Sequence, residues 1–106
     1  MALSLIHAPA RVARGQVFEI RASVAHSMES GQRADSEGRL LARDIVRRVE
    51  CRVGGELVFA ADLFPAIAAN PYLAFHAVAV ASGALVVRWS GDNGFEHSAS
   101  IQIEVT

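Results

Sequence analysis

Apolar and polar residues alternate with a period of two along most of this chain, and this alternation constrains its fold more than any other feature. Successive side chains of a β-strand point to opposite faces, so an alternating segment has one buried face and one solvated face. The alternation predicts strands rather than helices. The strand segments that we expect are residues 17–26, 45–53, 56–62, 84–90 and 95–105.

Turn signals separate these segments about every ten residues. Gly54-Gly55 suits a two-residue hairpin turn, Ser82-Gly83 suits a second turn, and residues 91–94 read Gly-Asp-Asn-Gly. Before the first long strand, residues 3–12 read as a short edge strand interrupted by Pro9. The prediction is one all-β domain over residues 1–106, an immunoglobulin-like antiparallel β-sandwich of about seven strands.

Three segments depart from this pattern. Residues 27–42 form a polar loop that is longer than the usual connection and is therefore a candidate functional or mobile segment. Residues 64–70 are rich in Ala and are expected to form one helical turn that ends at Pro71. Residues 72–81 are apolar with little alternation, which predicts a strand that is covered on both faces.

Composition excludes several classes of protein. Hydrophobic residues make up 52% of the 106 residues, but no apolar run reaches the roughly 18 residues of a membrane span. All ten basic residues are Arg, they are scattered among acidic residues, and the net charge is −1, which argues against nucleic-acid binding. The excess of apolar residues must therefore fill a core or a face that another chain covers.

No arrangement of residues predicts catalysis, and we assign no catalytic residue, metal site or cofactor. Cys51 is the only cysteine and falls on the inward register of its strand, which favours a buried and inert thiol. Two alternatives stay open. One is a sulfur-handling protein that uses Cys51 directly, and the other is a metal-binding redox sandwich that uses His26 and His76.

Aromatic residues and prolines gather between residues 59 and 75, in a segment that cannot form one strand face. Such a segment is either an interface core or an internal corner of the sandwich. Alternation directs Leu73 and Phe75 inward and leaves the phenol of Tyr72 pointing outward, where it suits an interface. The candidate partner-binding residues are Phe64, Pro65, Asn70, Pro71 and Tyr72.

Several motifs in this segment and beyond it resemble the SoxZ family of bacterial sulfur-oxidation proteins. The resemblance rests on Ala60-Ala-Asp-Leu, on Pro65-Ala-Ile and on Ala69-Asn-Pro-Tyr-Leu-Ala-Phe75. Further matching segments are His26–Arg33, Arg43-Asp-Ile-Val with Cys51 and Gly54-Gly55, and the hairpin of Trp89 with Asp92-Asn93-Gly94. The chain departs from the family pattern at Ser27, where proline is expected, and at Phe64, where histidine is expected.

The resemblance implies a non-catalytic subunit that forms a heterodimer with a SoxY-like protein during thiosulfate oxidation. SoxY proteins hold the sulfur intermediate on the cysteine of a flexible glycine-rich arm, which we do not find here. The resemblance also implies transient contacts with other Sox enzymes in the periplasm. Residues 1–9 do not read as a signal peptide, so we expect export together with the partner. Expressed alone, the chain is expected to be able to form a homodimer through the same exposed apolar surface that binds the partner.

Overall fold

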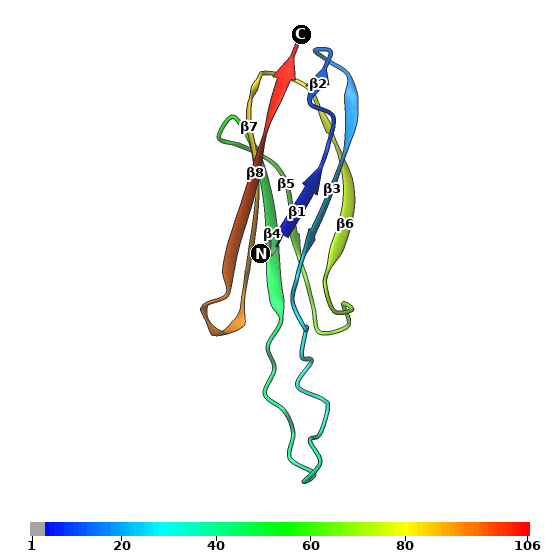
Figure 1. Cartoon of the computed structure of the whole chain (residues 1–106), viewed down its shortest axis with the longest axis vertical. Coiled ribbons are helices and arrows are strands. Elements are labelled where there is room, and N and C mark those ends of the chain that lie inside the picture. The colour runs from blue at the N-terminus through cyan, green and yellow to red at the C-terminus, as the bar shows by residue number, and fades with distance from the viewer. Residues whose placement is uncertain (1–3) are drawn as a thin grey trace.

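Two β-sheets face each other across one apolar core in the computed structural model, which describes residues 4–106 (Figure 1). The three-stranded sheet has the order β1 (Ser4–His7), β3 (Val17–Val24) and β6 (Tyr72–Val78). The five-stranded sheet has the order β2 (Arg11–Val12), β8 (Glu96–Val105), β7 (Gly83–Gly91), β4 (Val46–Val53) and β5 (Glu56–Asp62). The predicted β-sandwich is confirmed.

The strand count differs from the prediction because residues 3–12 contribute to both sheets. Leu3 lies outside the described residues, β1 pairs antiparallel with β3, and β2 pairs parallel with β8. Pro9 lies between β1 and β2 and has no backbone N–H to continue a ladder, so the chain crosses there from one sheet to the other. The described residues therefore hold eight strands rather than about seven.

The core lies between the inner faces of the two sheets and follows the predicted alternation. In β3 and β7, every second residue is buried, and Trp89 is the largest fully buried side chain. Burial of each such side chain contributes about 1.5–3 kcal/mol relative to exposure, which makes these residues the main source of stability. The fully buried residues are Ile20, Val24, Ile45, Val46, Val49, Cys51, Leu85, Val87 and Trp89.

The hairpin between β4 and β5 turns at Gly54 and Gly55, as predicted. Their φ angles are 59° and 87°, and residues with a Cβ rarely adopt this region. The β4–β7 ladder shifts register between Val46 and Arg48, which indicates a bulge. The irregularity lets Val46 and Val49 both face the core although they are three residues apart.

Two local predictions are wrong. Residues 64–70 form no helix, and a single turn closes where the N–H of Ile67 donates to the carbonyl of Phe64 at 3.0 Å. Strand β6 is an edge strand that is open on its outer face, and it ends at Val78 rather than at residue 81. Its inward positions carry Leu73 and Phe75, whereas its outward positions are exposed.

The predicted loop of residues 27–42 is confirmed as a long excursion from one end of the sandwich (Figure 1). Two isolated bridges, Glu29 with Asp44 and Ala34 with Leu40, hold its two arms together. Within residues 4–106, no helix has the length and apolar character required to cross a membrane.

Candidate partner-binding face

The outer face of the three-stranded sheet exposes large apolar side chains from all three strands. Leu5 on β1 is 65% exposed, Val17 on β3 is 59% exposed, and Tyr72 and Val78 on β6 are 58% and 53% exposed. Inner-face burial accounts for the fold, so these outward residues add nothing to the core. Scattered exposed apolar residues are ordinary, but a group of them on one sheet face is typical of an interaction site.

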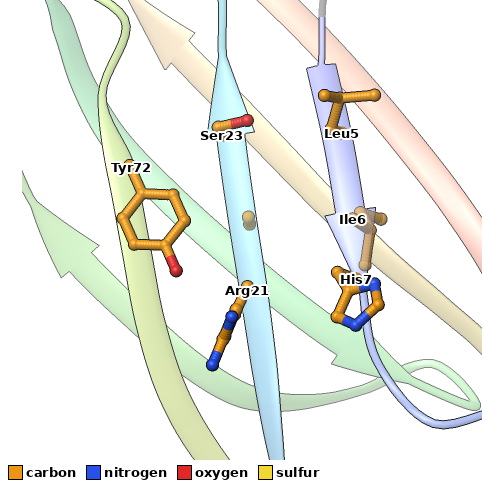
Figure 2. A pocket seen from close by; sticks show the side chains of 7 residues that line it. Leu5, Ile6, His7, Arg21, Ser23 and Tyr72 are labelled. Atoms are coloured by element: carbon orange, nitrogen blue, oxygen red, sulfur yellow. The ribbon is translucent and has the colours of Figure 1, made fainter.

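A shallow hollow on this face gathers residues from strands that are distant in the sequence. Figure 2 shows Leu5 and His7 on β1, Arg21 on β3 and Tyr72 on β6, all on the same side of the sheet. The antiparallel registers explain this grouping, because His7 lies opposite Arg21 and Ser23 lies opposite Tyr72. We define the outer apolar face as the surface formed by Leu5, His7, Val17, Arg21, Ser23, Tyr72 and Val78, together with Glu19, Ala74 and His76, which point to the same side of the sheet.

Arg21 carries the positive charge of this hollow. Its Nε donates to Oε1 of Glu19, two residues away on the same strand face, at 2.7 Å. This hydrogen bond and the charge of Glu19 raise the pKa of Arg21 above its ordinary value. Figure 2 shows Arg21 on β3, between Tyr72 on β6 and His7 on β1. The hollow offers a cation and hydrogen-bonding groups within an apolar surround.

The loop before β6 is fixed by Asn70 rather than left free. The carboxamide Oδ1 of Asn70 accepts a hydrogen bond from the N–H of His26 at 3.0 Å, and its own N–H donates to the carbonyl of His26 at 2.7 Å. Its φ angle is 54°, a left-handed conformation that asparagine tolerates better than most residues. Next to it, Pro71 is buried, and its carbonyl accepts from the N–H of Val24 at 3.1 Å.

The five residues predicted from the sequence therefore lie in different environments. Phe64 and Tyr72 are exposed, Pro65 is half-buried, and Asn70 is exposed but bonded to His26. Pro71 faces the interior, so it supports the segment and offers no surface to a partner. The hollow beside Tyr72 is lined by β1 and β3, and neither Phe64 nor Pro65 lines it.

Sequence reasoning missed Leu5, His7 and Arg21. The alternation in residues 17–26 did place Arg21 on the outer face, but no sequence signal paired it with residues of β1. That pairing follows from the crossing of the chain between the two sheets at Pro9. The hollow thus forms only because β1 and β6 both pair with β3.

Cys51 is fully buried between the two sheets on β4. Burial raises the pKa of its thiol to about 11, because the thiolate loses its hydration there. At neutral pH, only about one thiol in ten thousand is then ionised, and the thiolate is the reactive form. This environment agrees with the predicted inert thiol and argues against direct sulfur handling by Cys51.

The structure separates the two histidines of the metal-site alternative. His76 lies opposite Glu19 in the β3–β6 ladder, whereas His26 follows β3 seven residues after Glu19. At about 3.3 Å per residue, this spacing places them roughly 20 Å apart. Residues 4–106 contain no group of three or more His, Cys, Asp or Glu side chains that could hold a metal ion.

His26 instead fastens the start of the long loop. Its Nδ1 accepts a hydrogen bond from the N–H of Met28 at 2.9 Å, and its Nε2 lies 3.6 Å from Oδ1 of Asp44. The ring packs edge-on against Phe95, with centroids 4.8 Å apart. These contacts show a structural role for His26.

The far end of the same loop is held by Asp92. Its carboxylate accepts two hydrogen bonds from Arg43 at 2.9 Å each and one from the N–H of Ile45 at 3.2 Å, and Arg47 lies 3.3 Å away. The hydrogen bonds from Arg43, with smaller effects from Ile45 and Arg47, lower the pKa of Asp92 below its ordinary value. The loop is thus tied to the sandwich at both ends.

Comparison with known proteins identifies the family. Residues 6–102 match the family described as sulphur oxidation protein SoxZ, which covers nearly the whole chain. The chain belongs to the SoxZ family. The resemblance read from the motifs around residues 60–75 is thereby confirmed. No curated protein sequence matches the chain.

Solved structures share the fold at low sequence identity. A superoxide reductase (neelaredoxin) from Ignicoccus hospitalis has a TM-score of 0.73 and 20% identity, over 99% of this chain and 81% of that one. The sulfur carrier protein SoxY from Chlorobium limicola f. thiosulfatophilum has a TM-score of 0.67 and 15% identity, over 100% and 81% of the two chains. At these identities, the likeness shows the fold alone.

Proposed function

We propose that this SoxZ-family chain is the non-catalytic subunit of a two-subunit sulfur carrier and binds a SoxY-type protein through its outer apolar face. The partner would hold the covalent sulfur intermediate of thiosulfate oxidation in the periplasm, and this chain would position the partner for the enzymes that act on it. Contacts with those enzymes would be transient. Export together with the partner would bring the chain to that compartment.

The observation that carries the proposal is the exposed apolar face. The residues that could have been reactive do not form a site, because Cys51 is buried and His26 lies far from His76. Leu5, Val17, Tyr72 and Val78 lie on one sheet face, and their burial by a partner would be favourable at about 25 cal/mol per Å² of apolar area. Cys51, the one nucleophile of interest, is enclosed in the core. Such a chain is suited to binding rather than to chemistry.

Tyr72 and Arg21 are the proposed anchors of this interface. Aromatic residues and arginine dominate the binding energy of protein interfaces, because they combine large contact area with a polar tip. The hollow between Tyr72, Leu5 and His7 would receive a side chain of the partner, and Arg21 would face an acidic group on it. Phe64, Pro65 and Asn70 remain proposed contacts at the adjoining loop.

Mixing the chain with a purified SoxY-type protein from the same organism tests the proposal. Size-exclusion chromatography with light scattering should give one complex of 1:1 stoichiometry at micromolar concentration. The interface should bury roughly 1,600 Å² in total. Two separate peaks at that concentration would contradict the proposed function.

A further inference from the structure

Among residues 4–106, one side of β6 has no neighbouring strand. The carbonyl of Pro71 accepts a hydrogen bond from the N–H of Val24. The N–H of Ala79 donates to the carbonyl of Gln16 at 2.9 Å, and the carbonyl of Ala79 accepts from the N–H of Gly15 at 2.8 Å. Both residues therefore direct their backbone groups toward β3. The N–H and C=O groups of successive residues in a strand point alternately to its two sides. The even-numbered residues between Pro71 and Ala79 therefore direct these groups away from β3. Unpaired N–H and C=O groups therefore line the free edge at Tyr72, Ala74, His76 and Val78.

This free edge lacks the features that usually prevent strand pairing. Proteins protect edges with charged side chains, proline, bulges or a covering segment. Strand β6 reads Tyr-Leu-Ala-Phe-His-Ala-Val, without Lys, Arg, Asp, Glu or Pro, and its ladder with β3 runs from Tyr72 to Val78 without a register shift. The edge is thus regular, uncharged and largely apolar.

The other sheet has a free edge of different character at β5. Antiparallel pairing of β5 with a second β5 about Phe59 would place Glu56 opposite Asp62 twice. Like charges directly opposite each other destabilise a strand pair. Strand β6 has no such conflict.

We propose that β6 pairs in antiparallel fashion with β6 of a second copy of this chain, joining two three-stranded sheets into one six-stranded sheet. The twofold axis passes beside Phe75, so that Tyr72 lies opposite Val78 and Ala74 lies opposite His76. All four residues direct their backbone groups to the free edge, so each opposed pair exchanges two hydrogen bonds. Tyr72 against Val78 is an aromatic and β-branched pair, which is favourable across strands.

The proposal is independent of the proposed function, because the pairing uses the edge of the sheet and leaves the outer apolar face open. The second copy is the occupant that fits best, since the edge is self-complementary in charge, hydrogen bonding and side-chain size. The homodimer expected from the sequence forms through the exposed apolar surface, whereas the pairing proposed here uses the free edge of β6.

Cysteine cross-linking reads out both the pairing and its register. An opposed hydrogen-bonded pair has Cα atoms about 5.5 Å apart, within the range that a disulfide spans. A mixture of Ala74→Cys chains with His76→Cys chains should form a disulfide-linked dimer under mild oxidation. Each variant alone is the matched control, because the diagonal distance of about 7–8 Å is too long. Cys51 is buried and does not compete.

The expected result is a cross-linked yield in the mixture at least tenfold above that of either variant alone. No cross-link in the mixture, or an equal yield in one variant alone, would overturn the proposal. Sedimentation velocity of the unmodified chain provides a second measurement, with a concentration-dependent dimer expected. Ala74→Pro removes only an edge N–H and should raise the dimer dissociation constant at least tenfold while the melting curve stays cooperative. An unchanged dissociation constant would contradict the proposal.

Discussion

The two sheets bury equivalent inner faces but present different outer faces to solvent. On the five-stranded sheet, arginine and glutamate pair along and across the strands, with Arg48 bonded to Glu50 at 3.0 Å and Arg88 bonded to Glu96 at 2.6 Å. On the three-stranded sheet, Leu5, Val17, Tyr72 and Val78 are exposed on the corresponding surface, beside the one pair of Arg21 with Glu19. Folding demands only the inner faces, so the composition of each outer face reflects what that face contacts.

Electrostatics explains why the charged face should stay in water. Arg48 holds the pKa of Glu50 below its ordinary value, chiefly through their hydrogen bond. The same hydrogen bond raises the pKa of Arg48 above its ordinary value. Covering this face would remove several charges from water, a cost that ion pairing often fails to recover. Covering the outer apolar face removes mainly apolar area from water, which is favourable. The difference supports the proposal that the partner binds the three-stranded sheet.

The largest expected effect separates the two sides of β6. Phe75 faces the core and stacks on Phe59 with centroids 4.0 Å apart, so Phe75→Ala should lower the free energy of unfolding by about 3–5 kcal/mol. Tyr72→Ala, on the opposite side of the same strand, should lower it far less. Urea unfolding of both variants measures this. A larger loss for Tyr72→Ala would mean that the strand faces the other way.

The second effect concerns binding and compares the two outer faces. Tyr72→Ala should weaken binding to the SoxY-type partner by about 1–2 kcal/mol, because an aromatic anchor is lost from the hollow. Arg88→Ala is the matched control on the charged face and should leave the affinity unchanged. Titration calorimetry of both variants decides the matter. Equal losses would show that binding does not distinguish the two faces.

The sequence predicts those features of the two faces that depend on neighbouring residues in the chain. It does not predict those that depend on which strands pair. Alternation around Phe75 predicts the outward direction of Tyr72, and alternation in β7 predicts the burial of Trp89. The hollow beside Leu5 depends on the pairing of β1 with β3, which no local pattern encodes. The hydrogen bonds between Asn70 and His26, which are 44 residues apart, are likewise not encoded in any local pattern.

A third effect concerns Cys51, in the core between the two sheets. Cys51→Ala removes a fully buried sulfur and should lower the free energy of unfolding by about 1–2 kcal/mol. Thiosulfate turnover in a reconstituted system should stay intact, because the pKa of the thiol is raised to about 11 and little thiolate exists. A thiol reagent should react with the native chain far more slowly than with the unfolded chain. Lost turnover in a folded Cys51→Ala protein would restore the alternative of direct sulfur handling.

The smallest effect is expected on the charged face itself. Arg88 and Glu96 are about half exposed, and exposed ion pairs add little stability because water and salt screen them. Arg88→Ala should therefore leave the melting temperature almost unchanged at moderate salt. Thermal melts with and without added salt measure this. A clear loss of stability would show that the ion pairs contribute to folding.

Arginine modification of the complex tests the central claim most directly, because both outer faces carry arginine. Arg21 with Glu19 on the outer apolar face and Arg88 with Glu96 on the charged face are similarly exposed and similarly paired. Phenylglyoxal labelling with and without the SoxY-type partner, read by mass spectrometry, compares them in one sample. The account predicts that the partner protects Arg21 and leaves the labelling of Arg88 unchanged. Protection of Arg88 with Arg21 still labelled would contradict it.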